Sequence, residues 1–322
     1  MLSLSTVLEP IREDLIKVED SLGSINQAHV GHLSELLGYS LGGSGKRIRP
    51  ALTLLSGKFY NYDFDCLLPM AVAVELLHAA TLLHDDIIDK SAVRRGRATV
   101  NAVWGEGKVV LFGDYLFAKA AQFCASTGNL RVIKLFSQTL ATISIGELNQ
   151  AFSAFSLDQT REQYLDRISN KTASLFILAT ESGAILSQAP ERSVDILREY
   201  GYNLGIAFQI VDDILDFIAT EEELGKSMGS DLSEGTLTLP MMLLLEYYPK
   251  DNPIERFFRN RKELEAKKRV IELICNSPIV QECYDIAADY GARACQNLNL
   301  LPGNTSRQAL EDLVDYIIRR KQ

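Results

Sequence analysis

Cysteine is scarce in this sequence of 322 residues, and the five that occur are scattered: Cys66, Cys124, Cys275, Cys283 and Cys295. Their odd number argues against a fully paired disulfide framework, and the lack of C-x-x-C spacing argues against a structural zinc site. We therefore expect reduced, buried thiols, as in cytoplasmic proteins.

Basic residues are also in the minority. The chain has 33 lysines and arginines against 42 aspartates and glutamates, a net charge of -9. A nucleic-acid-binding protein would show a basic surplus or a basic stripe, so we expect no nucleic-acid partner. The deficit does not exclude a phosphate ligand, because a few clustered cations and a bound metal reverse the local field.

Long uncharged apolar runs are missing as well. None reaches the roughly 18 residues that span a bilayer, so we expect no transmembrane segment and only peripheral membrane contact. The N-terminus reaches Glu9, Arg12 and Glu13 soon after Met1, which is unlike a signal peptide. Together with the cysteine pattern, this predicts a cytoplasmic protein.

Strand-like alternation is absent too, whereas helical spacing occurs throughout. Near the N-terminus, apolar residues recur at positions 4, 7, 8, 11, 15 and 18. Pro69 is expected to begin a long helix, and another is expected to begin near Asn170 with Ser169 or Asn170 as its cap. With 47% hydrophobic residues, no repeat and no domain boundary, the sequence predicts one all-α domain over residues 1–322.

An acidic cluster interrupts one of these apolar helices. Asp85, Asp86 and Asp89 follow a long apolar run. Asp85 and Asp89 are four residues apart and share a helix face, on which His78 also falls. Two such carboxylates repel each other unless a cation lies between them, and oxygen ligands suit Mg²⁺ better than Zn²⁺. Alone, such a cluster is more often a solvated helix face.

A second copy of the pattern changes this interpretation. Asp212, Asp213 and Asp216 repeat it about 130 residues later, again in an apolar helical background, and Gln209 lies seven residues before Asp216. Two helices that each carry a carboxylate pair on one stripe would hold several Mg²⁺ ions around a polyanion.

Two basic segments accompany the motifs. Segment 42–50 reads Gly-Gly-Ser-Gly-Lys-Arg-Ile-Arg-Pro; it lacks the order of a nucleotide-binding P-loop and does not follow a strand. Segment 90–97 places further cations directly after the first motif. Composition alone would also fit exposed turns, but cations beside metal ligands are well placed to neutralise a diphosphate.

The paired aspartate motifs and the Gly-Lys-Arg-x-Arg-Pro segment resemble the trans-isoprenyl diphosphate synthases, or polyprenyl synthetases, over nearly the whole chain. The resemblance implies a bundle of long helices around a deep central cavity, the isoprenoid synthase type. It also implies condensation of isopentenyl diphosphate with an allylic diphosphate, Mg²⁺ as cofactor, and a homodimer whose membrane contact, for product release, is peripheral.

The resemblance also assigns roles to individual residues. The predicted metal ligands are Asp85, Asp89 and Asp212, supported in catalysis by Asp86, Asp213 and Asp216. The predicted contacts to isopentenyl diphosphate are Lys46, Arg49, His78 and Arg95. The predicted contacts to the allylic diphosphate are Arg94, Lys171, Thr172, Gln209 and Lys226, and Lys171 is also catalytic. Thr236 stands where many relatives have a further lysine.

Product length is predicted from the helix before the first motif. Residues five, eight and eleven positions before Asp85 are Ala80, Leu77 and Val74, which with Thr81 form the predicted chain-length wall. In short-chain relatives an aromatic residue one turn before the aspartates closes this pocket. Its absence predicts a long product, heptaprenyl to decaprenyl diphosphate, with geranylgeranyl diphosphate as the alternative. A packing role for Ala80, with larger residues deeper in the cavity forming its floor, is the other interpretation.

Two remoter functions stay open at this point. A terpene cyclase would use similar helices and Mg²⁺, but its second metal motif typically differs from the one at 212–216. A subunit of a heteromeric synthase would typically lose aspartates or cations, most of which this chain keeps. The starter, the pathway and the need for a second subunit are not fixed by the sequence. The basic end Arg319, Arg320 and Lys321 suits a helix C-terminus, and we assign it no function.

Overall fold

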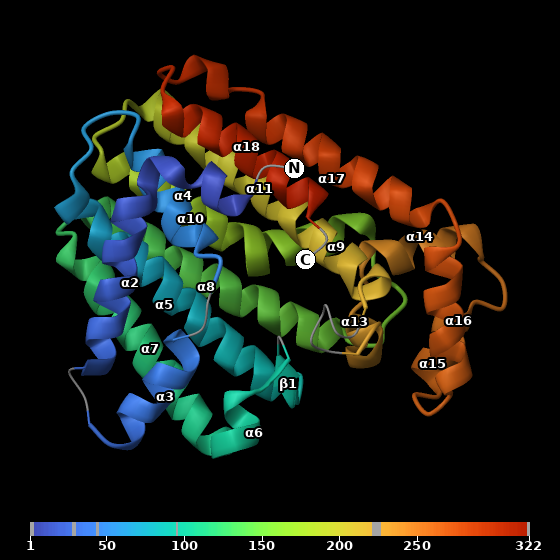
Figure 1. The fold of residues 1–322 in the computed structure, drawn as a ribbon. Helices are drawn as coiled ribbons and strands as arrows, with labels where there is room; N and C mark the ends of the chain where they lie inside the picture. The colour runs from blue at the N-terminus through green and yellow to red at the C-terminus, as the bar shows by residue number, and fades with distance from the viewer. Residues whose placement is uncertain (1–2, 28–29, 43–44, 95, 221–226, 321–322) are drawn as a thin grey trace.

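A computed structural model describes residues 3–27, 30–42, 45–94, 96–220 and 227–320. Helices dominate the described part of the chain, which confirms the all-α prediction (Figure 1). The elements of the first half are α1 (Leu4–Val7), η1 (Glu9–Ile11), α2 (Arg12–Gln27), α3 (His32–Leu41), α4 (Ile48–Gly57), α5 (Phe64–Ile88), β1 (Val93–Arg94), β2 (Arg97–Ala98), α6 (Val100–Trp104), α7 (Glu106–Ser126) and α8 (Leu130–Ser153).

The second half continues with shorter helices around one very long one. Its elements are α9 (Arg161–Ile168), η2 (Ser169–Ala173), α10 (Ser174–Leu186), α11 (Glu191–Ile218), α13 (Ser230–Glu234), α14 (Leu239–Tyr247), α15 (Pro253–Arg259), α16 (Leu264–Cys275), α17 (Ile279–Cys295), η3 (Leu298–Leu300) and α18 (Thr305–Arg319).

The centre of the molecule is built from α5, α10 and α11. Helix α5 packs along α7 and α4, α10 packs against α4 and α11, and α11 packs along α17 (Figure 1). One apolar core includes the buried residues of α4, α5 and α10, and a second surrounds the C-terminal half of α11. Because α11 contributes to both cores, it fixes the second aspartate motif relative to the rest of the bundle.

Helix α5 carries the first motif and is apolar on nearly every side. It begins earlier than predicted, at Phe64, because the side chain of Asp63 caps it by accepting hydrogen bonds from the backbone N–H groups of Asp65 and Cys66. Pro69 therefore lies inside the helix and does not begin it. By length and composition alone α5 would cross a membrane, but 61% of its most apolar window is buried inside the protein, and buried core helices pass the same test.

A short hairpin follows α5 where the sequence predicted only a basic loop. Strands β1 and β2 pair antiparallel, with Val93 opposite Ala98 and Arg94 opposite Arg97. Gly96 occupies the turn with a φ of 71°, a conformation that glycine adopts without strain. From β1, Arg94 reaches Asp86 in the last turn of α5.

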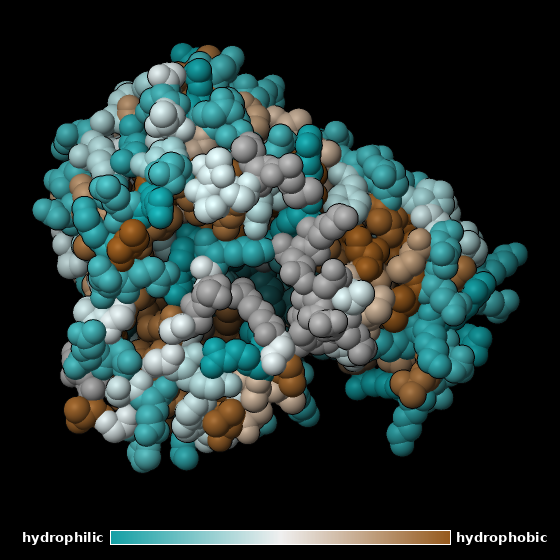
Figure 2. Space-filling model, in the orientation of Figure 1, coloured by the Kyte–Doolittle hydropathy of each residue, from teal (hydrophilic) through white to brown (hydrophobic). Residues whose placement is uncertain are grey.

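The face seen in Figure 2 is hollowed near its centre, and the visible depth of the hollow is hydrophilic. Apolar side chains dominate the core behind it, so polar groups within the bundle require a functional or structural reason.

Candidate active site

The first aspartate motif lies at the C-terminal end of α5. Asp85 and Asp86 are in its last turn, and Asp89 is the C-cap residue. Asp86 is buried and accepts a hydrogen bond of 2.7 Å from Nε of Arg94. Arg94, a predicted allylic contact, therefore holds the motif from the side of the hairpin in this structure.

Lys171 lies opposite this motif. Its Nζ is 2.9 Å from a carboxylate oxygen of Glu147 on α8 and 3.8 Å from Oδ2 of Asp85. Lys171 belongs to η2, a π-helical turn that joins α9 to α10 without a break, so the prediction of a new capped helix near Asn170 is wrong. Single π-turns inside α-helices are frequent at functional sites.

The residue after Lys171 reaches the second motif. The hydroxyl of Thr172 donates to Oε1 of Gln209 at 2.6 Å, and Nε2 of Gln209 donates to Oδ1 of Asp213 at 2.9 Å. The turn η2 thus connects both aspartate motifs through two consecutive side chains. The structure brings together Asp85, Lys171, Thr172, Gln209 and Asp213, all of which the sequence had singled out.

Close glycine contacts position this π-turn between two helices. A Cβ added to Gly146 of α8 would lie 3.1 Å from the backbone nitrogen of Lys171, and one added to Gly205 of α11 would lie 2.5 Å from Cα of Ala173. Gly205 therefore approaches η2 more closely than a larger residue allows, and a larger residue at Gly146 would force its neighbours to shift slightly.

The three aspartates of the second motif have different surroundings. The side chain of Asp212 is 41% exposed, whereas Asp213 and Asp216 are buried. Asp216 accepts hydrogen bonds from the hydroxyl of Ser230 at 2.6 Å and from the backbone nitrogen of Asp231 at 3.1 Å. Asp212 alone therefore presents a carboxylate to solvent, which suits its predicted role as a metal ligand, while the others suit supporting roles.

Arg320 corrects the interpretation of the basic C-terminus. It is buried, its Nη2 donates to Oδ1 of Asp212 at 2.5 Å and to the backbone oxygen of Phe208 at 2.9 Å, and its guanidinium lies 3.8 Å from the centre of the Phe208 ring. Arg320 is thus part of the site, and not a solubilising helix end. Nothing in the local sequence distinguishes it from its neighbour Arg319, so only the fold identifies it.

The electrostatics of the first motif favour a bound cation. Burial raises the pKa values of Asp86, Asp89 and Glu147. Burial alone would lower the pKa of Lys171, but neighbouring Asp85 and Glu147 raise it overall. Several carboxylates therefore share the neighbourhood of Lys171 and Arg94, and a cation would relieve their mutual repulsion.

The residues also fit an oxygen-bound divalent cation. Asp85, Asp89 and Asp212 offer only hard oxygen donors, as Mg²⁺ and Ca²⁺ require. Across the described ranges, however, no three carboxylate, imidazole or thiolate side chains lie close enough together to bind a metal ion by themselves.

The cations predicted for isopentenyl diphosphate lie near the start of α4 and the end of α18. The guanidinium of Arg49 is 5.0 Å from the centre of the Phe176 ring, and Nζ of Lys46 is 5.8 Å from that of Tyr316. Arg49 and Arg320 both approach the Phe208 ring, which places the Gly-Lys-Arg segment beside the second motif.

The other predicted residues lie either on α5 or outside the described part of the chain. His78 is half-buried on α5, and its backbone oxygen accepts a hydrogen bond from the Thr81 hydroxyl. Ala80, Leu77 and Val74 are fully buried. The remaining predicted contacts, Arg95 and Lys226, lie outside the described residues.

Besides Arg320, two residues of the site escaped the sequence analysis as functional candidates: Glu147, the partner of Lys171, and Tyr164, whose hydroxyl donates to Asp213 at 2.7 Å. A polar residue within the apolar segment 130–152 was a signal for Glu147. Tyr164 carries no signal, since a tyrosine in a helix is commonly a core residue.

Comparisons with known proteins identify the family that the chain matches. A family model described as polyprenyl synthetase matches residues 30–274. The chain is 37% identical to the chloroplastic solanesyl-diphosphate synthase 2 of Oryza sativa subsp. japonica, over 99% of this chain and 80% of that protein. It is 36% identical to the heptaprenyl diphosphate synthase component 2 of Geobacillus stearothermophilus, over 99% of both.

Solved structures show the same fold. A polyprenyl synthase from Caulobacter crescentus, complexed with calcium and isoprenyl diphosphate, superposes with a TM-score of 0.94 at 33% identity, covering 99% of this chain and 98% of that one. A decaprenyl diphosphate synthase from Rhodobacter capsulatus superposes with a TM-score of 0.91 at 34% identity, covering 99% of this chain and 100% of that one.

Proposed function

Because the chain belongs to the polyprenyl synthetase family, we propose that it is a Mg²⁺-dependent prenyltransferase that condenses isopentenyl diphosphate with an allylic diphosphate. The observation that carries this proposal is the π-turn whose consecutive residues, Lys171 and Thr172, reach toward the two aspartate motifs. We propose a long all-trans product, heptaprenyl to decaprenyl diphosphate, made by one domain that spans residues 1–322.

In this proposal the allylic diphosphate lies between the motifs. Lys171 and Arg94 are placed beside the carboxylates of the first motif and would each turn toward the diphosphate oxygens, supported by Lys226. Mg²⁺ held by Asp85, Asp89 and Asp212 would neutralise the negative charge that develops as the diphosphate departs. The carbon–oxygen bond breaks with its electron pair on the diphosphate, and the Thr172 hydroxyl lies beside the allylic cation.

Isopentenyl diphosphate would bind next to the allylic diphosphate. Its predicted contacts are Lys46, Arg49, His78 and Arg95. Its double bond supplies the electron pair of the new carbon–carbon bond. The resulting cation then loses a proton, which the released diphosphate accepts, and a new double bond forms. This chemistry needs no protein nucleophile.

The direct test is chromatography of products made by the purified chain from isopentenyl diphosphate and each of several allylic starters, with and without Mg²⁺. Products of 35 to 50 carbons that require both substrates and the metal are expected from the proposed function. A cyclic hydrocarbon would support a terpene cyclase instead.

Geranylgeranyl diphosphate is the second candidate product. Synthases of this compound from Lactobacillus brevis and Pyrococcus horikoshii superpose with TM-scores of 0.88 and 0.87, each at 30% identity. A sharp product of 20 carbons would favour this alternative within the same reaction.

We predict that the two diphosphate sites are separable by mutation. Replacing Arg49 with alanine should raise the KM for isopentenyl diphosphate by about 10-fold or more and leave the KM for the allylic substrate within a factor of two, because charge-assisted hydrogen bonds to phosphate are lost at one site only. Lys226→Ala should raise the KM for the allylic substrate and leave the KM for isopentenyl diphosphate nearly unchanged. Initial-rate kinetics with each substrate varied in turn provide the measurement, and equal effects of both variants on both substrates would contradict the assignment.

We also propose a homodimer, formed through an apolar surface on α7 and α8. Leu111 is 70% exposed, and Leu148 and Phe152, four residues apart on one face of α8, are 56% and 86% exposed. Large exposed apolar side chains gathered on adjacent helices are typical of protein interfaces. The heptaprenyl synthase relatives are named as components, so a second, different subunit is the alternative.

The prediction for this surface is that Leu148→Glu yields a monomer. A charge buried against a second copy has no partner there, so association should weaken by at least about 100-fold. Sedimentation velocity measures the assembly, and Ala288→Glu, an exposed change on α17, is the control that should stay dimeric. A wild-type chain that is a fully active monomer would rule out the homodimer. Full activity of the chain alone would rule out a required second subunit.

The proposed setting is the cytoplasm, with peripheral membrane contact for release of a long apolar product. Three of the curated relatives are named as chloroplastic.

A further inference from the structure

Tyr164 is a buried residue that the proposed mechanism leaves unused. Its side chain is 1% exposed, and its hydroxyl donates to Oδ2 of Asp213 at 2.7 Å. Asp213 is itself buried, and its other oxygen accepts from Gln209 at 2.9 Å. Both oxygens of this carboxylate therefore depend on side-chain donors from two different helices, α9 and α11.

The bonds form one continuous chain that ends in the active site. Tyr164 donates to Asp213, Gln209 donates to Asp213, and the Thr172 hydroxyl donates to Oε1 of Gln209 at 2.6 Å. Because the Gln209 amide must direct its nitrogen to Asp213, its oxygen is left facing Thr172. The orientation of the Thr172 hydroxyl thus depends on the position of Asp213.

Helix α9 holds Tyr164 firmly at the outer end of this chain. The helix begins with a capping box made by Thr160 and Gln163. One turn after Tyr164, the buried Arg167 donates to the backbone oxygen of Leu237 at 2.6 Å and to Gln159 at 2.7 Å. The hydroxyl of Tyr164 is therefore presented from a fixed support.

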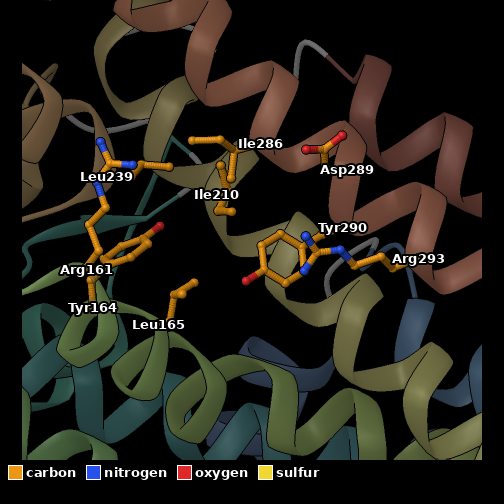
Figure 3. A pocket seen from close by; sticks show the side chains of 9 residues that line it. All are labelled: Arg161, Tyr164, Leu165, Ile210, Leu239, Ile286, Asp289, Tyr290 and Arg293. Carbon is orange, nitrogen blue, oxygen red and sulfur yellow. The ribbon is translucent and has the colours of Figure 1, made fainter.

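Tyr164 borders a cavity of about 230 Å³ between α9, α11, α14 and α17, together with Leu165, Ile210 and Tyr290 (Figure 3). Since packing is incomplete on this side, the bond to Asp213 supplies a constraint that close packing does not.

We propose that Tyr164 is a positioning residue: through Asp213 and Gln209 it fixes the Thr172 hydroxyl where the allylic cation forms. The inference rests on the function proposed above. Of the four side chains in this chain of bonds, only Tyr164 lies outside the residues predicted for the site, so a change there tests positioning without removing a predicted contact.

The test is Tyr164→Phe, which removes one oxygen and keeps the ring. A lost hydrogen bond to a charged group should lower kcat by about 10- to 100-fold. The KM for isopentenyl diphosphate should stay within a factor of two, because Lys46 and Arg49 are not in the chain of bonds. The affinity for a non-reactive allylic thiodiphosphate, measured by calorimetry without turnover, should fall.

The matched control is Tyr200→Phe. Tyr200 is equally buried, lies on α11, and donates its hydroxyl to the backbone oxygen of Leu310 at 2.8 Å, away from the second motif. Its loss should lower the melting temperature by a similar amount and leave the kinetics unchanged. Equal kinetic losses in both variants would mean that Tyr164 acts only through stability and would overturn the inference.

A double-mutant cycle tests the connection itself. If Tyr164 acts through Thr172, the variant Tyr164→Phe/Thr172→Val should lose clearly less activity than the product of the two single losses. The inference would be overturned if the activity loss of the double variant equals the product of the two single losses, or if Tyr164→Phe has wild-type kinetics. The proposed function would stand in either case. A wild-type chain that makes no prenyl product would overturn both.

Discussion

Replacing Asp85 or Asp212 with alanine is expected to lower kcat by three orders of magnitude or more. In the proposed mechanism each residue offers a carboxylate where the leaving diphosphate develops charge, and metal-assisted stabilisation of such charge contributes several kcal/mol, on the order of 10³-fold in rate. Asp85 lies 3.8 Å from Lys171, and Asp212 is the exposed member of its motif, so each variant removes one side of the same site.

The measurement is the single-turnover rate at saturating substrates and Mg²⁺, with circular dichroism to confirm folding. Asp195→Ala, which removes an exposed aspartate paired with Arg198 elsewhere on α11, is the control and should keep wild-type activity. Near-normal turnover by a folded Asp85→Ala or Asp212→Ala variant would refute the mechanism.

The sequence predicted the helices and both motifs because these rest on local spacing. Four-residue separation places Asp85 and Asp89 on one face wherever the helix lies, and apolar periodicity identifies helical segments without knowledge of their partners. Boundaries were less certain, as the early start of α5 shows: the cap at Asp63 competes with the proline at position 69, and the cap decides where the helix begins.

The connections between the motifs were beyond prediction, because they depend on how helices pack. Whether the segment 169–173 begins a helix or continues one as a π-turn is decided by α8 and α11, which approach it at Gly146 and Gly205. Arg320 reaches Asp212 only because α18 lies across the bundle and ends there. Such pairings join residues from separate helices, 108 positions apart in the case of Arg320 and Asp212, and one sequence carries no local signal for them.

The last prediction concerns the predicted chain-length wall on α5. Ala80 and Leu77 are fully buried, and Thr81 is half-buried with its hydroxyl bonded to the backbone oxygen of His78 at 2.8 Å. A growing tail that leaves the first motif along this helix passes these positions at about 1.5 Å per residue. A phenylalanine here would exclude the volume of a further isoprene unit, because closely packed walls cannot simply move aside.

We therefore expect Ala80→Phe and Thr81→Phe to shorten the product from at least 35 carbons to about 15 or 20, while the rate of the first condensation stays within about threefold of the wild type. Product chromatography measures the length, and a thermal melt measures the cost of overpacking, about 1–3 kcal/mol for an enlarged buried side chain. Ala71, which is also fully buried on α5 but lies nine residues before Ala80 and therefore on the opposite face of the helix, is the control for overpacking alone: Ala71→Phe should destabilise the protein without changing the product length. An unchanged long product in both wall variants would show that Ala80 is only a packing residue. The floor of the cavity would then be set by larger side chains further from Asp85.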